Sequence, residues 1–310
     1  MEKTVCIAVL NYNGIEFLEE LVPTLRAALR EWDRPCSVVI LDNHSSTPVK
    51  EWVQKNCPEF EFVLAKKNNF LFSYNDLVAS RFEEIFIFLN NDIKVEQNFI
   101  EPLVKHFEFD DVFSVASTSM DWEGKKYTTG PWYLGIRKGF YFWDCRVDDQ
   151  RLCHTLLTVG GHMAVDREKF LDLGGFNLLF YPAYCEETEL CLRAWKRGWR
   201  CIFEPKSLVY HFDGGSFNKN TKKASIQLRS YFLMQFACLP IVRPCIFSSL
   251  FILLRVIRYT LTLQFYWPKT YFKTLFEWWS KSKQQKCQRI TETELVEINR
   301  KISVGPFANG

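Results

Sequence analysis

The stretch VCIAVLNYNG at residues 5–14 contains the strongest fold signal in the chain. Val5–Leu10 is an uninterrupted apolar run, which is typical of a strand buried on both faces. The polar residues 11–14 favour a turn, and Ile15–Leu29 then places apolar residues at helical spacing. A strand, a turn and a helix in this order are the first unit of a parallel sheet covered by helices.

The same pattern recurs through the first 110 residues. Further buried strands are predicted at Val38–Leu41, Phe60–Ala65 and Ile85–Leu89. Repeated strand–helix units predict an α/β fold with a mostly parallel sheet flanked by helices. Ligands of such sheets bind beyond the carboxyl ends of the strands, so those positions are the ones to inspect.

Asn and Asp residues follow each of the four predicted strands. For any one loop, the preference of these residue types for turns and helix caps is explanation enough. Four consecutive strands that end this way favour a shared polar cleft instead. The residues concerned are Asn11 and Asn13, Asp42 and Asn43, Asn69 with Asn75 shortly after it, and Asn91 and Asp92.

The next part of the chain has weaker periodicity. Residues 112–165 are rich in aromatic side chains and are predicted to be less regular, either as the acceptor side of a cleft or as plain packing. A Gly-led strand is predicted at 160–165 and a short helix at 166–173. Cys185–Gly198 is predicted to be a helix with Glu186, Glu187 and Glu189 at its start, where acidic groups also complement the helix dipole.

Composition divides the chain in two. Of 310 residues, 47% are apolar, which supports a sizeable core and excludes a disordered chain. From Lys219 to the end, 15 Lys and Arg stand against 4 Glu, a net charge of +11, whereas the remainder has a net charge of −8. We therefore predict an α/β domain at residues 1–218 and a basic, aromatic-rich helical region at residues 219–310.

The basic region suggests an anionic partner. It has no run of about 18 uncharged apolar residues, so a spanning helix is not predicted. Aromatics interleaved with Lys and Arg instead resemble an interfacial segment on the inner leaflet of a membrane, with packing on the domain or a homodimer contact as the alternatives. The many Trp and Phe residues speak against nucleic acid as the partner.

Cysteine usage and the amino terminus favour a cytoplasmic chain. The 11 cysteines are scattered and include no CxxC pair, so no zinc site is predicted. The first residues lack the charged and then apolar pattern of a signal peptide. We expect reduced thiols and a cytoplasmic location, peripheral on the cytoplasmic face of the membrane if the basic region binds lipid.

The polar residues match the needs of sugar transfer from a nucleoside diphosphate. Asp42 can accept a hydrogen bond from a nucleobase. Asp92 can coordinate a hard divalent cation at the diphosphate, with His211 from a later predicted strand, 207–212, completing the metal site. Glu187 can take the proton of an acceptor hydroxyl.

In order along residues 4–217, the chain resembles family 2 glycosyltransferases of the GT-A fold, which is Rossmann-like. The resemblance is greatest to the rhamnosyltransferase-like and galactofuranosyltransferase-like enzymes of bacterial surface polysaccharides. The matching segments are residues 11–14, 41–46, 69–75, 89–92, 161–163, 174–177, 184–193, 209–211 and 214–216.

The resemblance implies an inverting, metal-dependent hexosyl- or deoxyhexosyl-transferase. Its donor would be a UDP- or dTDP-linked sugar, its cofactor Mg²⁺ or Mn²⁺, and its acceptor a glycan or a lipid-linked glycan in cell-envelope polysaccharide synthesis. Asp42 would contact the base, Asp92 and His211 would hold the metal, and Glu187 would be the catalytic base, supported by Glu186 and Glu189.

Two alternatives remain. The family's Glu-Asp pair is Glu186-Glu187 here, and its DxD-like motif begins with Asn90, so a catalytically degenerate sugar-binding or assembly subunit is one alternative. A nucleotidyltransferase is the other, although the first loop lacks the basic, Gly-rich sequence expected for phosphate binding.

Overall fold

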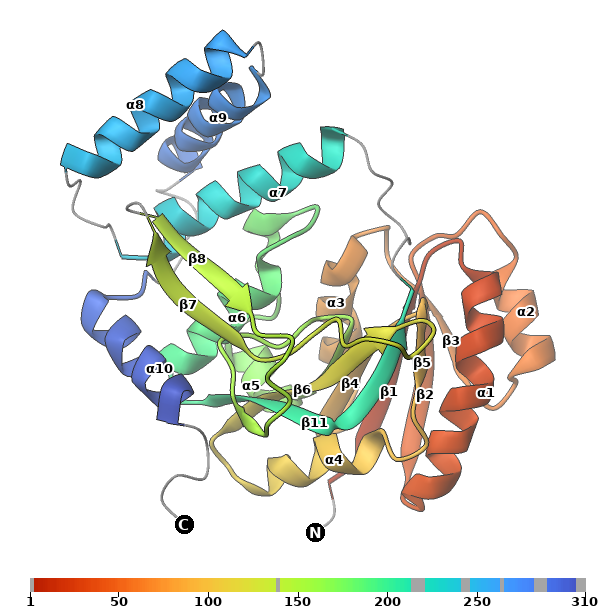
Figure 1. Ribbon diagram of the computed structural model, residues 1–310. Coiled ribbons are helices and arrows are strands. Elements are labelled where there is room, and N and C mark those ends of the chain that lie inside the picture. The colour runs from red at the N-terminus through yellow and green to blue at the C-terminus, as the bar shows by residue number, and fades with distance from the viewer. Residues whose placement is uncertain are drawn as a thin grey trace.

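The computed structural model describes residues 3–137, 140–212, 221–240, 246–262, 265–281 and 289–304. Over this part of the chain, a nine-stranded sheet lies at the centre with helices against both faces, and further helices follow it (Figure 1). The predicted α/β fold with a helical C-terminal region is therefore confirmed.

The first half of the sheet is parallel and follows the predicted strand–helix alternation. Strand β1 pairs with β2 and β4, and β2 pairs with β3, all in parallel. All four strands predicted here are present. The elements are β1 (Val5–Asn11), α1 (Ile15–Trp32), β2 (Cys36–Asp42), α2 (Val49–Asn56), β3 (Glu61–Leu64), a 3₁₀ turn η1 (Phe70–Phe72), α3 (Ser73–Ser80) and β4 (Ile85–Asn90).

The second half of the sheet mixes both directions. The predicted Gly-led strand is β10 (His162–Asp166), which runs antiparallel between β4 and β6 (Val112–Asp121). Strand β11 (Arg200–His211) is parallel to β6 and carries His211 at its end. Two short strands, β5 (Ile93–Val95) and β9 (Cys153–His154), pair antiparallel with β11.

The expectation of little regularity over residues 112–165 was wrong. Strand β6 crosses the middle of the sheet, but four of its buried residues are polar: Ser114, Ser117, Thr118 and Ser119. Their hydroxyls are hydrogen-bonded, so the strand can be buried without showing an apolar run. Most of the aromatic residues lie in a separate two-stranded sheet, β7 (Trp132–Arg137) and β8 (Phe140–Cys145).

Two apolar cores cover the two faces of the sheet. Along β1, Val5, Ile7 and Val9 belong to one core, whereas Cys6 and Ala8 belong to the other. This alternation follows from the two-residue repeat of a strand. Both faces are buried, which explains why the sequence shows continuous apolar runs in β1, β2 and β4.

The remaining helices complete the fold. The predicted helices after β10 and at the acidic cluster are present as α5 and α6. The elements are α4 (Ile100–Val104), η2 (Lys105–Glu108), α5 (Arg167–Asp172), η3 (Leu178–Phe180), α6 (Glu186–Lys196), α7 (Thr221–Leu233), the π-helical turn η4 (Met234–Cys238), α8 (Ile246–Leu261), α9 (Tyr266–Lys281) and α10 (Glu292–Val304).

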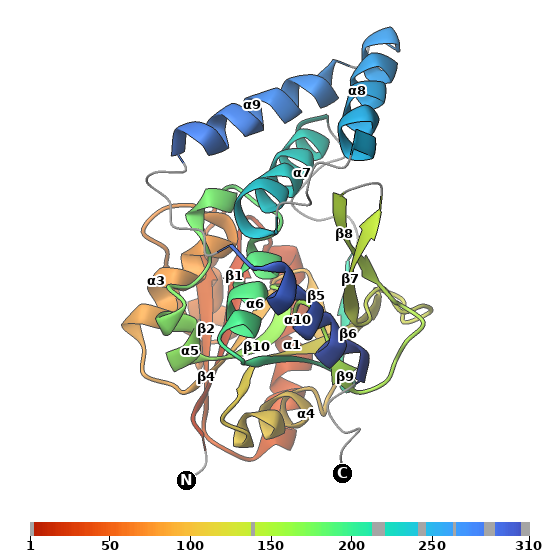
Figure 2. The ribbon, with the colours of Figure 1, turned by 90° about the vertical axis from the view of Figure 1, so that its left-hand side faces the viewer.

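The C-terminal helices lie in two places. Helix α7 runs above the sheet, with α8 and α9 stacked beyond it, while α10 lies lower, beside β7 and β9 (Figure 2). In the described part of the chain, no helix combines the length and apolar character needed to cross a membrane. The predicted boundary at 218–219 and the 214–216 segment lie outside the described residues.

Candidate functional site

A cavity of about 900 Å³ opens at the carboxyl ends of β1, β2 and β4. Its wall combines three groups of residues. The strand-end loops contribute Leu10, Tyr12, Asn43, Asn68, Phe70, Asn90, Asn91 and Asp92; the acidic segment contributes residues 182–188; and the aromatic sheet and α7 contribute Trp132, Phe142, Trp143, Lys223, Gln227 and Tyr231. The predicted cleft is therefore present where the strand ends placed it.

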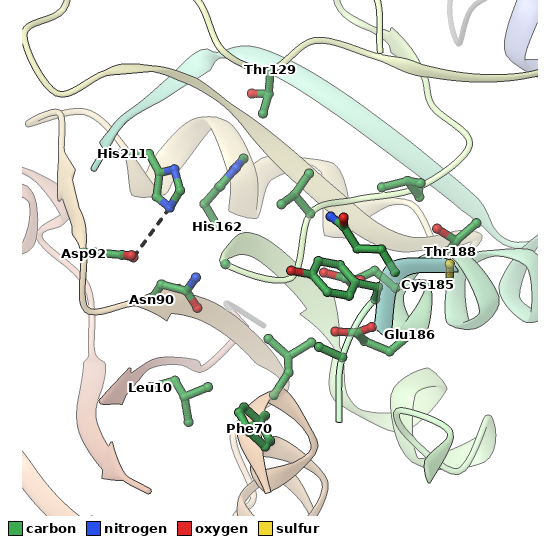
Figure 3. A pocket seen from close by; sticks show the side chains of 18 of the residues that line it. Leu10, Phe70, Asn90, Asp92, Thr129, His162, Cys185, Glu186, Thr188 and His211 are labelled. Atoms are coloured by element: carbon green, nitrogen blue, oxygen red, sulfur yellow. Dashed lines mark ion pairs between the residues drawn. The ribbon is translucent and has the colours of Figure 1, made fainter. Parts of the chain in front are cut away.

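Asp92 and His211 meet on one side of the cavity, as Figure 3 shows. The Nε2 atom of His211 lies 3.6 Å from Oδ1 of Asp92, and the Asp92 side chain is largely buried. Among the residues that the structure describes, none donates a hydrogen bond to this Oδ1 atom. A buried carboxylate oxygen without a donor, next to an imidazole, fits a divalent cation.

Metal binding by these two residues would be incomplete without substrate. Among the described residues, no cluster of three His, Cys, Asp or Glu side chains is arranged to hold a metal. Mg²⁺ typically binds through one or two carboxylates together with phosphate oxygens and water. Asp92 and His211 therefore fit a cation whose remaining ligands come from a diphosphate.

A buried hydrogen-bond network holds the strand ends together. The Nδ2 atom of Asn11 donates to Oδ1 of Asp42 at 2.9 Å, and its Oδ1 accepts from Nδ2 of Asn91 at 2.7 Å. Ser45 donates to both oxygens of Asp42. A Cβ atom on Gly14 would lie 2.0 Å from Asn91, so only glycine allows this approach. The network fixes Asn91, and with it the neighbouring Asp92.

Of the eight residues predicted to bind the donor, three line the cavity and five do not. Asn43, Asn91 and Asp92 line the cavity, whereas Asn11, Asn13, Asp42, Asn69 and Asn75 are outside its wall. Asp42 is buried with both oxygens engaged, and its contact with a nucleobase stays a prediction.

Hydrogen bonds explain why the other amides lie outside the wall. Asn13 accepts from the backbone N–H of Ser46. Asn75 clamps the backbone of Phe176, donating to its carbonyl and accepting from its N–H, each at 2.8 Å. The backbone carbonyl of Asn69 accepts a hydrogen bond from the backbone N–H of Phe72. The side chains of Asn13 and Asn75 therefore hold the loops around the cavity.

Glu186 and Glu187 lie at the start of α6, on the side opposite Asp92; Figure 3 labels Glu186 there. The two residues before the helix, Tyr184 and Cys185, have φ angles of 74° and 67°, a left-handed conformation that side chains disfavour. Such backbone strain is common at active sites. It turns both carboxyl groups into the cavity wall.

Glu187 also packs against Gly160. The backbone N–H of Gly160 donates to Oε1 of Glu187 at 3.3 Å. A Cβ atom at position 160 would lie 3.0 Å from Cγ and Oε1 of Glu187 and 2.9 Å from Leu71. A side chain at position 160 would require Leu71 and Glu187 to shift by a few tenths of an ångström, so glycine allows the carboxylate its close approach to this backbone.

Burial changes the protonation of the acidic pair. It raises the pKa of Glu186 well above the ordinary value, and repulsion from Glu187 raises it further. Burial also raises the pKa of Glu187, but the backbone N–H groups of Glu187 and Gly160 oppose this rise. Because Oε2 of Glu186 has no donor, Glu186 is the better site for a proton, and Glu187 the better base.

Glu189, the third member of the predicted acidic cluster, is not in the cavity wall. Arg193 binds both of its carboxylate oxygens, at 2.9 Å and 2.7 Å. Arg193 also donates to the carbonyls of Leu173 and Gly175. The structure therefore places Glu189 in an ion pair that anchors α6 to the preceding loop.

Several cavity residues were missed by the sequence analysis. His162 lies beside His211 (Figure 3), and burial together with His211 lowers its pKa to about 3, so its ring is neutral. Its position directly after Gly161 was the available signal. Lys223, Gln227 and Tyr231 carried no signal beyond the basic, aromatic character of their region.

A family model and a curated relative match parts of the chain. The model of the family described as "Glycosyl transferase family 2" matches residues 4–174. A curated relative, the "Putative polypeptide N-acetylgalactosaminyltransferase 10" of Drosophila melanogaster, is 22% identical over 191 residues. That match covers 56% of this chain and 30% of the relative, so the chain spans less than a third of it.

Solved structures share the fold at low identity. GalNAc-T7 with UDP, GalNAc and Mn²⁺ matches at a TM-score of 0.59 and 16% identity, covering 76% of this chain and 48% of that one. The mannosyltransferase PcManGT from Pyrobaculum calidifontis, with GDP-Man and Mn²⁺, matches at 0.54 and 15%, covering 75% and 63%. S. aureus TarS residues 1–349 with UDP match at 0.51 and 14%, covering 75% and 65%.

These neighbours are glycosyltransferases, and they confirm the predicted GT-A fold. The family match covers more than half of the 310 residues and includes the loops after β1, β2, β3 and β4 that line the cavity. The chain therefore belongs to glycosyl transferase family 2.

Proposed function

We propose that the chain transfers a hexosyl or deoxyhexosyl group from a nucleoside diphosphate to a hydroxyl of a glycan or a lipid-linked glycan, with inversion at the anomeric carbon. The observation that carries this is the cavity itself, with the buried Asp92 carboxylate 3.6 Å from His211 on one side and the Glu186-Glu187 pair on the other. The role in cell-envelope polysaccharide synthesis rests on sequence resemblance.

On the donor side, Asp92 and His211 would hold Mg²⁺ or Mn²⁺. The cation would neutralise the diphosphate as it leaves the sugar. Asn91 and Asn43 line the same part of the cavity and can donate to phosphate or ribose oxygens. The structures with UDP or GDP-Man and Mn²⁺ support this type of donor.

On the acceptor side, Glu187 would take the hydroxyl proton while the acceptor oxygen attacks the anomeric carbon. The bond between that carbon and the diphosphate oxygen breaks in the same step, which inverts the configuration. Glu187 must be ionised to act, so the rate should fall as pH drops through its raised pKa. Tyr184 and the aromatic sheet offer apolar faces to an acceptor ring.

A nucleotide-release assay tests the proposal. UDP-N-acetylgalactosamine, GDP-mannose and a dTDP-sugar are each incubated with the chain and Mn²⁺, with and without glycan acceptors. Release that needs both Mn²⁺ and Glu187 supports the proposal. If no donor is consumed while UDP, GDP or dTDP still binds, the degenerate sugar-binding alternative replaces it.

We also propose that α8 and α9 bind an anionic membrane surface. Of the 20 large exposed apolar residues in the described chain, nine lie in the segment 253–279. Four exposed basic residues accompany them, and the segment has one acidic residue, Glu277. Apolar and basic residues on two helices beyond α7 suit insertion at a headgroup layer.

Vesicle co-sedimentation tests this surface. Full-length chain is mixed with vesicles of phosphatidylcholine alone or with phosphatidylglycerol. The double variant Phe276→Ser with Trp279→Ser should lose binding to the anionic vesicles, and added salt should weaken binding by the wild type. Val296→Ser, an equally exposed residue on α10, is the matched control. Equal sedimentation by all three chains would remove the proposal.

A further inference from the structure

Helix α7 contacts residues 179–183, which precede the acidic pair Glu186-Glu187. Arg229 donates through Nη1 to the carbonyl of Tyr181 at 3.1 Å and through Nη2 to the carbonyl of Leu179 at 3.3 Å. The next residue, Ser230, is fully buried and donates to the carbonyl of Ala183 at 2.9 Å. Two neighbouring side chains of α7 thus hold three carbonyls in the segment that leads to Glu186.

That segment needs such support. It contains the strained residues Tyr184 and Cys185, which come immediately before the acidic pair. Strained backbone persists only where its surroundings enforce it. The carbonyls of residues 179, 181 and 183 are held on the amino-terminal side of the acidic pair, and Gly160 holds Glu187 from the other side.

Arg229 is itself oriented from α9. Its Nε and Nη2 atoms bind the two carboxylate oxygens of Glu277 at 3.0 Å and 2.6 Å. Both side chains are largely buried. A two-pronged guanidinium–carboxylate pair fixes the guanidinium plane, which leaves its remaining N–H groups aimed at the carbonyls.

We propose that Arg229 is a positioning residue for the catalytic acidic pair, and that Glu277 sets its orientation. The proposal rests on the role of Glu187 as the base of the proposed transfer. Arg229 acts through the backbone of residues 179–185 and is not a catalytic residue. Its loss lets that segment relax, which moves Glu187 away from the acceptor while leaving Asp92 and Asn91 in place.

Kinetics and binding of Arg229→Ala test this directly. Nucleotide release from whichever of UDP-N-acetylgalactosamine or GDP-mannose the wild type consumes should show a kcat about tenfold to a hundredfold lower. The dissociation constant of the matching nucleotide with Mn²⁺ should stay within about twofold, since α7's Arg229 does not contact the Asp92 side. Arg229→Lys keeps the positive charge but loses the two-pronged guanidinium geometry, so its kcat should lie between those of the wild type and Arg229→Ala.

Two further variants serve as controls for this test. Arg300→Ala removes an exposed arginine of α10 that pairs with Glu297 on the surface, and should match the wild type in every measurement. Glu277→Gln keeps the shape of its side chain, so it should fold even if Arg229→Ala does not. It should lower kcat less than Arg229→Ala, again with nucleotide affinity unchanged.

Hydrogen exchange of the backbone amides gives a readout that needs no activity. In Arg229→Ala or Glu277→Gln, amides of residues 184–189 should exchange about tenfold faster than in the wild type, while those of residues 90–92 are unchanged. Equal exchange at residues 184–189 would overturn the proposal, as would equal losses of kcat and nucleotide affinity. If the wild type consumes no donor, the proposed transfer fails, but faster exchange would still show that Arg229 holds the segment.

Discussion

The two sides of the cavity are built in different ways. The Asp92 side rests on adjacent strands, whose ends are joined by the short network of Asn11, Asp42 and Asn91. The Glu187 side rests on a strained segment before α6 and is held from a helix more than forty residues further along the chain. One side is thus fixed by the sheet, whereas the other is fixed by hydrogen bonds from α7.

Because the two sides are held differently, substitutions on each side should affect different properties of the protein. Changes in the sheet network should cost folding stability, because its groups are buried and hydrogen-bonded to one another. Changes around Glu187 should cost rate, because the proposed transfer depends on accurate placement of its base. Three variants separate these effects, and they are taken from the largest expected effect to the smallest.

Glu187→Gln should produce the largest loss. The amide cannot take a proton, so kcat for nucleotide release in the presence of acceptor should fall by about 10² to 10⁴. Affinity for nucleotide with Mn²⁺ should remain, because Asp92 and His211 are untouched. Glu297→Gln, an exposed glutamate on α10, serves as the control. Unchanged turnover in Glu187→Gln would remove this residue as the base.

Asn11→Ala should cost stability on the other side of the cavity. It leaves Nδ2 of Asn91 without its acceptor and removes one donor from Asp42, both of them buried. We expect a loss of about 1 to 3 kcal/mol in the free energy of unfolding, measured with urea. Asn56→Ala, at an exposed helix end, should change it by less than about 0.5 kcal/mol. Equal effects of the two substitutions would contradict the network's role.

Glu186→Gln should give the smallest effect, and one that depends on pH. The pKa of Glu186 is higher in the folded chain than in the unfolded one, so the folded state holds more protons and stability falls as pH rises through the raised pKa. Because Gln cannot ionise, the stability of the variant should not fall in this pH range. Thermal unfolding should therefore show the variant more stable by about 1 kcal/mol at pH 8, with the gain shrinking towards pH 5. A destabilised variant at pH 8 would contradict the burial of this charge.

The Asp92 side of the cavity could be predicted from sequence because it depends on residues that follow the strands directly. Each strand is an apolar run, and Asn91 and Asp92 follow β4 immediately, so topology alone brings them to the cavity. The sequence does not show that Asn43 lines the cavity whereas Asp42 does not. The position of Asp42 depends on hydrogen bonds from Asn11 and Ser45, which both donate to its carboxylate.

The Glu187 side of the cavity could be predicted only in part. The acidic start of α6 was visible in the sequence, but the sequence does not show that Arg193 binds Glu189 and that Glu189 lies outside the cavity wall. Strand β6 was missed because its buried Ser and Thr residues hide the apolar pattern. The contribution of Lys223, Gln227 and Tyr231 depends on α7 packing over the cavity, which no local pattern encodes.

The most direct test of the account is nucleotide binding measured by calorimetry. UDP, GDP and dTDP are each titrated into the wild type, Asp92→Asn and Asp76→Asn, with and without Mn²⁺; Asp76 lies in an exposed pair with Lys66 and is the control. We predict that Mn²⁺ tightens binding of at least one nucleotide to the wild type and to Asp76→Asn, and that Asp92→Asn loses this gain. The same Mn²⁺-dependent affinity in Asp92→Asn as in the wild type would contradict a donor site built around Asp92.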